Sequence, residues 1–361
     1  MNLCHFLTQN ARRLPDAPAL IHGDRVTSWA TMQARAGALA QALINDYGLS
    51  KGDRLLVQSA NCLQMFEAMF ACWRVGAIWV PANFRQSPEE LAWLAQSSGA
   101  RLMLCGAEFA GHAQACAGLV EAVISIGPSD FGTDHDTLVA RHLGAMPPEA
   151  QVSRDDPCWF FFTSGTTGRP KAAVLTHGQM AFVVTNHLCD LMPGTTEADA
   201  SLVVAPLSHG AGIHQLTQVA RGVPSVLPEG ERFDPAQIWE LVERHRITNI
   251  FTVPTIVKLL VEHEAVDRFD HSSLRYVIYA GAPMYRADQI RALDKLGAVL
   301  VQYFGLGEVT GNITVLPPAL HSPDDRVMRI GTCGFARTGM QVEVQDDQGR
   351  ALSAGETGEI A

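Results

Sequence analysis

One stretch of the sequence combines the residue types that bind phosphate groups. It runs from the apolar WFFF at 159–162, through Thr163, Ser164, Gly165, Thr166, Thr167 and Gly168, to Pro170, Lys171 and the apolar AAVL at 172–175. Glycines let the backbone turn so that several amide N–H groups face one point, while the hydroxyls and the Lys171 ammonium supply further donors. The stretch therefore predicts a loop between two strands that holds a polyphosphate.

This loop is not the Walker motif, in which four residues separate the glycines and a lysine directly follows the second one. Here two residues separate Gly165 from Gly168, and two more come before Lys171. Thr176 and Gln179 follow at the spacing of a capping box. A helix is therefore expected to begin just after the second strand.

The elements that must position this loop alternate between strands and helices, which predicts parallel β-α-β crossovers. Helices are expected near 32–43, 63–75, 89–96, 235–246 and 255–263, and strands near 55–60, 77–80, 101–105, 201–206, 224–228, 249–254 and 274–281. Beyond residue 316, short segments separated by glycines predict an all-β piece. The expected fold class is α/β: two related layered subdomains with mostly parallel sheets, plus a small all-β, distorted-barrel piece.

The subdomains are expected at 1–155, 156–315 with the phosphate loop, and 316–361 as the start of the β-rich piece. The proline-containing stretch 145–156 is the candidate linker between the first two. The final GETGEIA resembles a turn leading into a strand, so the chain is expected to be a portion of a larger protein.

Composition excludes several classes of protein. The chain has 361 residues, a net charge of −10 and 47% hydrophobic residues, which is typical of globular domains rather than disordered or collagen-like chains. Because the charge is negative and no Lys/Arg run occurs, nucleic acid is not an expected partner. Eight scattered cysteines, without a zinc-type spacing, predict reduced thiols and a cytoplasmic location. No membrane span is expected, because the longest apolar stretch, 65–80, contains Glu67 and Arg74.

The TSGTTGRPK stretch at 163–171 resembles the signature loop of the adenylate-forming superfamily, which includes acyl-CoA synthetases, firefly-type luciferases and peptide-synthetase adenylation domains. Four further segments are similar to later motifs of that superfamily in the same order: PLSHGAG at 206–212, YAGAPM at 279–284, QYFGLGE at 302–308 and GETGEI at 355–360. The resemblance covers essentially the whole chain and is strongest to the large N-terminal domain of an acyl-CoA synthetase. The resemblance implies that the family's C-terminal domain would follow beyond this chain.

The resemblance implies site residues by position. Thr163, Ser164, Gly165, Thr166, Thr167, Gly168 and Lys171 would hold the ATP phosphates, with Thr163, Lys171 and Glu308 as catalytic residues. Gly281, Ala282, Pro283, Gln302, Tyr303, Phe304, Gly305 and Gly307 would bind the nucleotide, and Glu308 would bind Mg²⁺. His209, Gly210 and Gly212 would line the acid site, although His209 also fits a partly buried structural histidine.

Two positions depart from the family pattern. Phe304 stands where the family usually has Tyr, and Gly307 stands where it has Thr near the α-phosphate. Loss of that hydroxyl predicts slower adenylation or a changed geometry at the α-phosphate. If the site otherwise matches the family, Gly307→Thr should leave activity equal or higher.

The implied function is ATP-dependent activation of a carboxylic acid, fatty or aryl, to an acyl-adenylate, followed in the full-length protein by transfer to coenzyme A. The expected partners are thus the acid, ATP and coenzyme A, and the truncated chain is expected to be incompetent for the complete reaction. Two alternatives stay open: a peptide-synthetase-type adenylation module, and a non-catalytic homologue that binds a nucleotide or a carboxylate. The oligomeric state is also open, a homodimer included.

Overall fold

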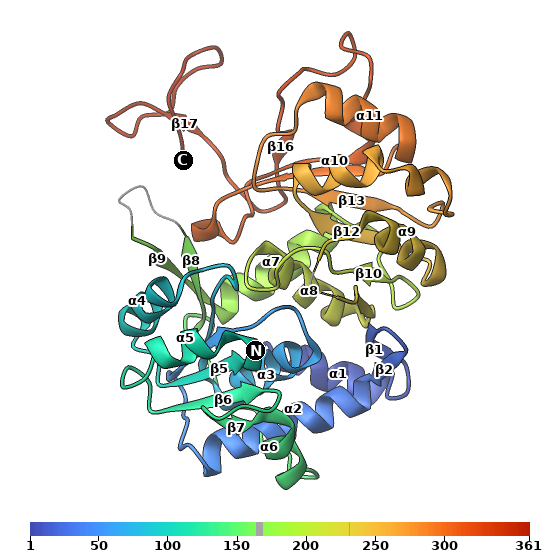
Figure 1. Ribbon diagram of the computed structural model, residues 1–361. Coiled ribbons are helices and arrows are strands. Elements are labelled where there is room, and N and C mark those ends of the chain that lie inside the picture. The colour runs from blue at the N-terminus through green and yellow to red at the C-terminus, as the bar shows by residue number, and fades with distance from the viewer. Residues whose placement is uncertain (164–168, 231) are drawn as a thin grey trace.

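Two β-sheets with helices packed on them form the body of the molecule, as a computed structural model shows for residues 1–163, 169–230 and 232–361 (Figure 1). Most neighbouring strands are parallel, which requires long crossover connections, and the helices supply these. The prediction of an α/β fold with mostly parallel sheets is confirmed.

The seven-stranded sheet has the order β7-β6-β5-β3-β4-β8-β9. Its strands are β3 (Arg54–Gln58), β4 (Ile78–Pro81), β5 (Leu102–Gly106), β6 (Ala122–Ile126), β7 (Thr133–Asp134), β8 (Pro157–Thr163) and β9 (Lys171–Thr176). The pair β8–β9 is an antiparallel hairpin at the edge of an otherwise parallel sheet. The helices in this part of the chain are α1 (His5–Arg13), α2 (Trp29–Asn45), α3 (Leu63–Val75), α4 (Pro88–Ser98), α5 (Ala110–Ala115) and α6 (His135–Arg141), with a 3-10 turn η1 (Ala107–Phe109).

The nine-stranded sheet has the order β16-β15-β14-β13-β12-β10-β11-β1-β2. Its strands are β1 (Pro18–His22), β2 (Arg25–Ser28), β10 (Ser201–Leu202), β11 (Ser225–Leu227), β12 (Asn249–Thr252), β13 (Tyr276–Tyr279), β14 (Leu300–Phe304), β15 (Thr314–Leu316) and β16 (Phe335–Ala336). The associated helices are α7 (His177–Asp190), α8 (Gly210–Arg221), α9 (Pro235–Arg244), α10 (Pro254–Glu262) and α11 (Arg286–Leu296), with 3-10 turns η2 (Glu264–Asp267), η3 (Gly307–Val309) and η4 (Pro318–Leu320). Strands β2, β15 and β16 are antiparallel to their neighbours, and the strands between them are parallel.

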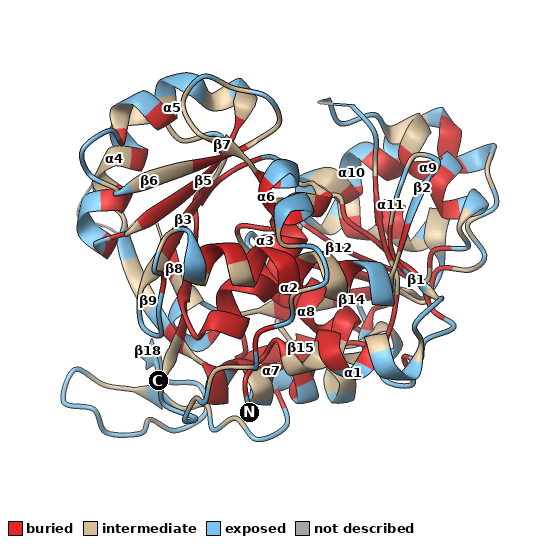
Figure 2. Cartoon of the chain, turned by 90° about the horizontal axis from the view of Figure 1, so that it is seen from below, coloured by how far each residue is buried: buried red, intermediate tan, exposed pale blue. Residues whose placement is uncertain are grey.

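Helices α7 and α8 lie between the two sheets (Figure 1). Helix α8 contacts α1 on one side and β12 on the other, while α7 contacts β9 and α8. Leu216 of α8 belongs to the core that includes α2 and α3, whereas Ala211 packs with Phe251 and Tyr303 of the other sheet. The buried residues of α2, α3 and α8 appear as continuous red in Figure 2. Helices α7 and α8 therefore join the cores of the two sheets.

Sequence patterns predicted most elements but not which sheet each joins. The helix predicted at 63–75 is α3, and the capping box at Thr176 and Gln179 is present with both of its hydrogen bonds. The hairpin β8–β9 belongs to the sheet formed by β3 to β7, and β1–β2 belongs to the other sheet, so each sheet takes strands from both sides of residue 155. The subdomain bounds stay a prediction.

Two predicted β regions are shorter than expected. The strand expected at 201–206 ends at Leu202. Pro206, which lacks the N–H that a sheet needs, comes just before the turn that leads into α8. Past β16, the strands β17 (Val344–Gln345) and β18 (Glu359–Ile360) form a separate two-stranded sheet. The barrel expected there stays a prediction.

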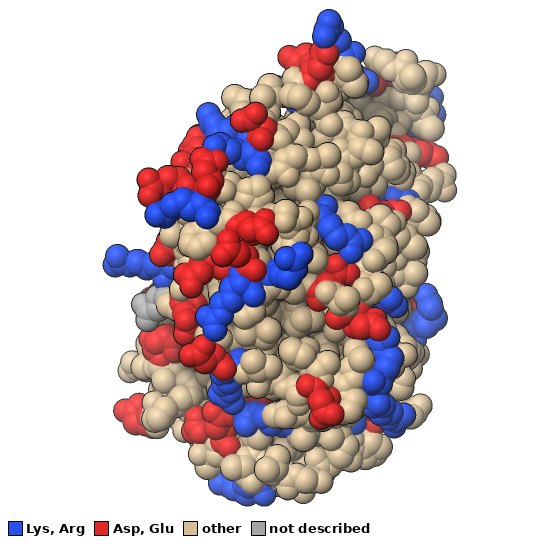
Figure 3. All heavy atoms as spheres, turned by 90° about the vertical axis from the view of Figure 1, so that its right-hand side faces the viewer, with Lys and Arg blue, Asp and Glu red and all other residues tan. Residues whose placement is uncertain are grey.

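Charged side chains of both signs are interspersed on the face that carries α9 to α11 (Figure 3). Several are paired, as Lys295 is with Asp267 at 2.7 Å and Arg291 is with Asp288 at 3.0 Å. All eight cysteines, each within the described residues, are free, and most are buried. In the described part of the chain, none of the helices combines the length and the apolar character that crossing a membrane requires.

His177 and His214 are among the buried histidines that have no carboxylate partner within hydrogen-bond distance. His177 begins α7, and its Nδ1 accepts a hydrogen bond from the Leu3 N–H at 3.4 Å. His214 lies inside α8, with Nε2 at 2.9 Å from Asn249 Oδ1. Burial lowers the pKa of both side chains from 6.5 to about 4, because the charged form would lose its hydration. Both are therefore neutral in the folded chain at neutral pH.

We expect the free energy of unfolding to decrease as the pH falls from 6.5 toward 4. Each buried histidine takes up a proton on unfolding, which adds a slope of about 1.4 kcal/mol per pH unit in this window. Above pH 6.5 this contribution is fully present, and it is lost as the pH falls. Urea unfolding near pH 7.5, 6 and 5 measures the slope, which should be smaller in His177→Gln. The exposed His22, changed to Gln, is the matched control, and an unchanged slope in His177→Gln contradicts the assignment.

Candidate functional site

A cavity of about 390 Å³ lies at the carboxyl ends of β12, β13 and β14. Ligands of open α/β sheets bind at this edge, because loops that leave neighbouring parallel strands meet there. Residues from both sheets and from the start of α8 line the cavity: Asn83, Phe161, Ala205, Pro206, His209, Gly210, Ala211, Ile213, Phe251, Val253, Ala280, Gly281, Tyr303, Gly305, Leu306, Gly307, Thr310 and Gly311.

Aromatic rings form much of the wall. Phe251 and Tyr303 meet edge to face with their centroids 5.6 Å apart, and Phe161 meets His209 in the same way at 5.7 Å. Burial lowers the pKa of His209, whose Nδ1 lies 2.8 Å from Ser208 Oγ. His209 therefore presents a neutral ring to the cavity at neutral pH.

The turn after β14 folds tightly onto Tyr303. A Cβ atom added at Gly305 would lie 2.0 Å from the Gly311 carbonyl carbon, and one added at Gly311 would lie 1.7 Å from the Tyr303 hydroxyl. The Tyr303 hydroxyl donates to the Thr310 carbonyl oxygen at 3.0 Å, and burial raises its pKa to about 12. Thr310 has φ of 56°, a left-handed conformation that is rare for a β-branched residue. Strained backbone of this kind is concentrated at functional sites.

Gly307 lies against β8, where there is no room for a side chain. A Cβ atom at this position would be 2.9 Å from both Phe161 Cδ1 and Thr163 Cγ2. The prediction that Gly307→Thr leaves activity equal or higher stays a prediction, and a threonine there would have to displace Phe161 or Thr163. Gly307 and Phe161 thus form one close contact, in which the lack of a side chain at 307 leaves room for the Phe161 ring.

The predicted phosphate hairpin opens beside this turn. Thr163 at the end of β8 pairs with Lys171 at the start of β9, and η3, which contains Glu308, lies against both strands. Lys171 and Glu308 are exposed, and Thr163 is half-buried. The predicted phosphate residues Ser164, Gly165, Thr166, Thr167 and Gly168 lie outside the described residues.

The other predicted residues divide into two groups. Gly281, Tyr303, Gly305, Gly307, His209 and Gly210 line the cavity, whereas Ala282, Pro283, Gln302, Phe304 and Gly212 do not. Ala282 and Pro283 are exposed, and Gln302 Oε1 accepts a hydrogen bond from the Tyr279 hydroxyl at 3.4 Å. A Cβ atom at Gly212 would be 2.1 Å from the Leu207 carbonyl oxygen, so the chain itself fills that space. The roles assigned to all these residues stay predictions.

Sequence reasoning did not identify Phe161, Phe251 or Asn83 as lining residues. Phe161 and Phe251 lie within apolar segments that were predicted as strands, where an inward side chain and one that faces a cavity look the same. The available signal was position, since Phe251 lies one residue before the carboxyl end of a parallel strand.

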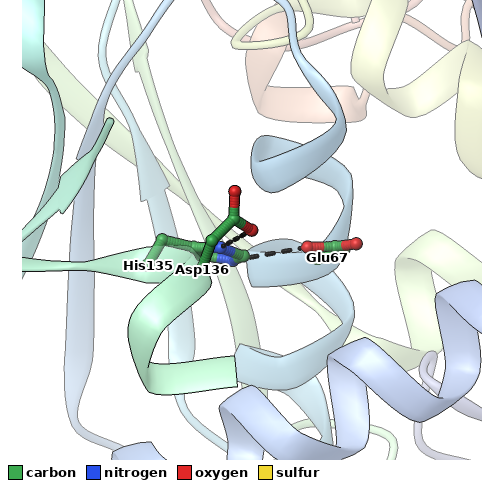
Figure 4. A group of neighbouring side chains, drawn as sticks. All are labelled: Glu67, His135 and Asp136. Carbon is green, nitrogen blue, oxygen red and sulfur yellow. Dashed lines mark hydrogen bonds and ion pairs between the residues drawn. The ribbon is translucent and has the colours of Figure 1, made fainter. Parts of the chain in front are cut away.

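A separate cluster joins Glu67, His135 and Asp136, which could in principle hold a metal ion (Figure 4). The two nitrogen atoms of His135 face different carboxylates, at 3.5 Å from Glu67 Oε2 and 3.3 Å from Asp136 Oδ1. The Arg35 guanidinium already pairs with both carboxylates. A second cation would be repelled by Arg35, so we interpret the cluster as an ion-pair network that ties α2, α3 and α6 together.

Comparisons with known proteins agree with this geometry. The model of the AMP-binding enzyme family matches residues 7–361. A feruloyl-CoA synthase of Amycolatopsis sp is 32% identical over 98% of this chain and 68% of its own length. A fatty acid–[acyl-carrier-protein] ligase, ScoC, of Streptomyces coeruleorubidus is 29% identical over 97% of this chain and 66% of its own length.

Solved structures show the same fold. The anthranilate CoA ligase AuaEII, in complex with anthranoyl-AMP, superposes with a TM-score of 0.89 at 21% identity, over all of this chain and 68% of that one. The N-terminal domain of FACL13 from Mycobacterium tuberculosis superposes with a TM-score of 0.87 at 25% identity, over all of this chain and 88% of that one.

We expect Gly307→Ala to lower the free energy of unfolding by about 1–3 kcal/mol, because its methyl group must displace Phe161 or Thr163. Combining it with Phe161→Leu should cost less than the sum of the two single changes, with a coupling of about 0.5–3 kcal/mol. Urea unfolding of the four proteins measures this cycle. Gly111→Ala, where nothing lies within 4 Å of the added atom, is the control and should show no loss. If the losses of unfolding free energy in the two single variants simply add up in the double variant, the contact between Gly307 and Phe161 is contradicted.

Proposed function

This chain belongs to the AMP-binding enzyme family, and from that premise we propose that it activates a carboxylic acid with ATP to an acyl-adenylate, which the full-length protein transfers to coenzyme A. The observation that carries the proposal is the position of the apolar cavity, which lies directly beside the opening of the β8–β9 hairpin. An acid in the cavity and phosphates at the hairpin would meet at Gly307 and Thr163.

The proposed reaction is an in-line displacement at phosphorus. A carboxylate oxygen attacks the α-phosphorus of ATP, the bond from that phosphorus to the β-phosphate oxygen breaks, and pyrophosphate leaves. The protein's contribution is positioning and electrostatic stabilisation rather than covalent chemistry. The hairpin donors and Lys171 would hold the leaving pyrophosphate, and the cavity would hold the acid with its carboxylate toward Gly307. The backbone of Gly281 to Pro283 would lie along the adenine.

Glu308 is the residue that we propose for Mg²⁺. Its carboxylate is exposed on η3, which lies against both strands of the hairpin. A carboxylate oxygen is a hard donor of the kind that Mg²⁺ prefers alongside phosphate oxygens, so the residue fits the ion. When bound, the ion would neutralise charge on the phosphates.

ATP–pyrophosphate exchange on the complete gene product tests the proposal. We expect exchange that depends on both ATP and an added carboxylic acid, followed by thioester formation when coenzyme A is supplied. ATP binding without exchange for any acid would instead support the non-catalytic homologue, because the nucleotide site would then exist without the reaction.

We expect Lys171→Ala to reduce the exchange rate by about 10²–10³-fold, because a cation that stabilises the leaving pyrophosphate is lost. Lys171→Arg should retain more activity than Lys171→Ala, since it keeps the charge but not the geometry. Lys258→Ala on α10, another exposed lysine, is the matched control and should exchange at the wild-type rate. A wild-type exchange rate in Lys171→Ala would contradict the assignment of Lys171 to the leaving pyrophosphate.

Glu308→Gln should raise the Mg²⁺ concentration needed for half-maximal exchange by about tenfold or more, because an amide binds the ion more weakly than a carboxylate. A magnesium titration of the exchange rate measures this shift. Glu262→Gln on α10 offers an exposed glutamate as control, which should leave the titration unchanged. An unshifted midpoint in Glu308→Gln would contradict the metal assignment.

A further inference from the structure

The inner wall of the cavity is built from two aromatic side chains. Phe251 comes from β12 and Tyr303 from β14, and both are buried. Their rings are 5.6 Å apart at an interplanar angle of 69°. Edge-to-face contact of this kind is favourable, so the two rings hold each other in place.

Phe251 is fixed from two sides. A Cβ atom at Gly210 would lie 3.0 Å from Phe251 Cζ, so the ring occupies the space that a larger residue at the start of α8 would need. Behind the ring, His214 stacks on it at 5.2 Å and is itself held by Asn249. Moving the phenyl group aside would disturb this buried polar contact, which is costly in an apolar core.

Tyr303 is fixed just as firmly. Its hydroxyl is bonded to the Thr310 carbonyl oxygen, and the His187 ring contacts the phenol edge to face at 5.5 Å. The buried guanidinium of Arg337 lies 5.4 Å from the centre of the Tyr303 ring. The space behind the wall is thus occupied by polar and charged groups, which an alkyl chain could not favourably displace.

The wall limits the length of any acid that binds. The cavity volume of about 390 Å³ is shared, because Gly281 and Gly307, which we assign to the nucleotide side, also line it. Four rings, those of Phe161, His209, Phe251 and Tyr303, surround the remaining space. Aromatic walls favour a flat ring that offers its face and edge.

We propose that the acid is a compact one, with a single aromatic ring joined to the carboxyl group directly or through a short spacer, and that Phe251 sets the length limit. This inference rests on the proposed function. Long-chain fatty acids are excluded by the wall that Phe251 and Tyr303 form.

The test is ATP–pyrophosphate exchange by the complete gene product with benzoate, 3-phenylpropenoate, hexanoate, dodecanoate and hexadecanoate. We expect kcat/KM for the better aryl acid to exceed that for dodecanoate by about tenfold or more, since a few misplaced methylene groups have effects of this size. A preference for dodecanoate or hexadecanoate would overturn the inference while leaving the proposed function intact. No exchange with any acid would remove the proposed function, and this inference with it.

Phe251→Ala should lower the ratio of kcat/KM for the better aryl acid to kcat/KM for dodecanoate by about tenfold, because it opens the wall toward His214. Phe182→Ala on α7, an exposed phenylalanine outside the cavity, is the matched control and should keep the wild-type ratio. Phe251→Leu should lower the same ratio by a smaller factor. If the alanine variant does not fold, the leucine variant tests whether Phe251 sets the length limit. A folded variant at 251 with the wild-type ratio shows that Phe251 does not set the limit.

Discussion

The close packing of the turn after β14 against β8 is the constraint on which the site depends. Gly307 lies so near Phe161 and Thr163 that a single added carbon atom would collide with both. This contact joins the two sheets where the hairpin opens, and it aligns the cavity with the hairpin. A shift of either sheet would separate the residues that we assign to the acid from those that we assign to the phosphates.

The same region contains buried polar groups, and burying them without hydrogen-bond partners costs free energy. Arg337 is fully buried, and its Nε and Nη1 have no hydrogen-bond partner among the described residues. Burial lowers its pKa to about 10, so it stays charged at neutral pH. Its Nη2 lies 3.0 Å from His187 Nδ1, and the next residue, Thr338, bonds to Asp190 at the end of α7. These contacts tie the segment after β16 to α7, the helix that follows the hairpin. Polar burial of this kind is tolerated where it fixes one arrangement.

Sequence patterns predicted local structure well and sheet membership poorly. The helix at 63–75 and the capping box at Thr176 depend on nearby residues, so spacing alone identified them. The assignment of β1–β2 and β8–β9 to their sheets depends on pairing between distant segments: Leu20 pairs with Ser225, for example. Such pairing leaves no local signal, because a buried strand has the same apolar composition in either sheet.

The site follows the same division. Among the described residues, those that the motifs assigned to nucleotide binding lie at the ends of strands, as Thr163 and Lys171 do, or just past them, as Gly281 does. Their glycines and hydroxyl residues are conspicuous in sequence. The residues that shape the acid cavity, Phe251 and Phe161, lie inside strands and carry no motif. Gly307 shows why the two groups cannot be interpreted separately. In the sequence alone, Gly307 indicates only that an expected hydroxyl is missing. In the structure, its lack of a side chain leaves the space in which the Phe161 ring faces the cavity. The chemistry and the selectivity that we propose for the site therefore depend on the same contact, that of Gly307 with Phe161.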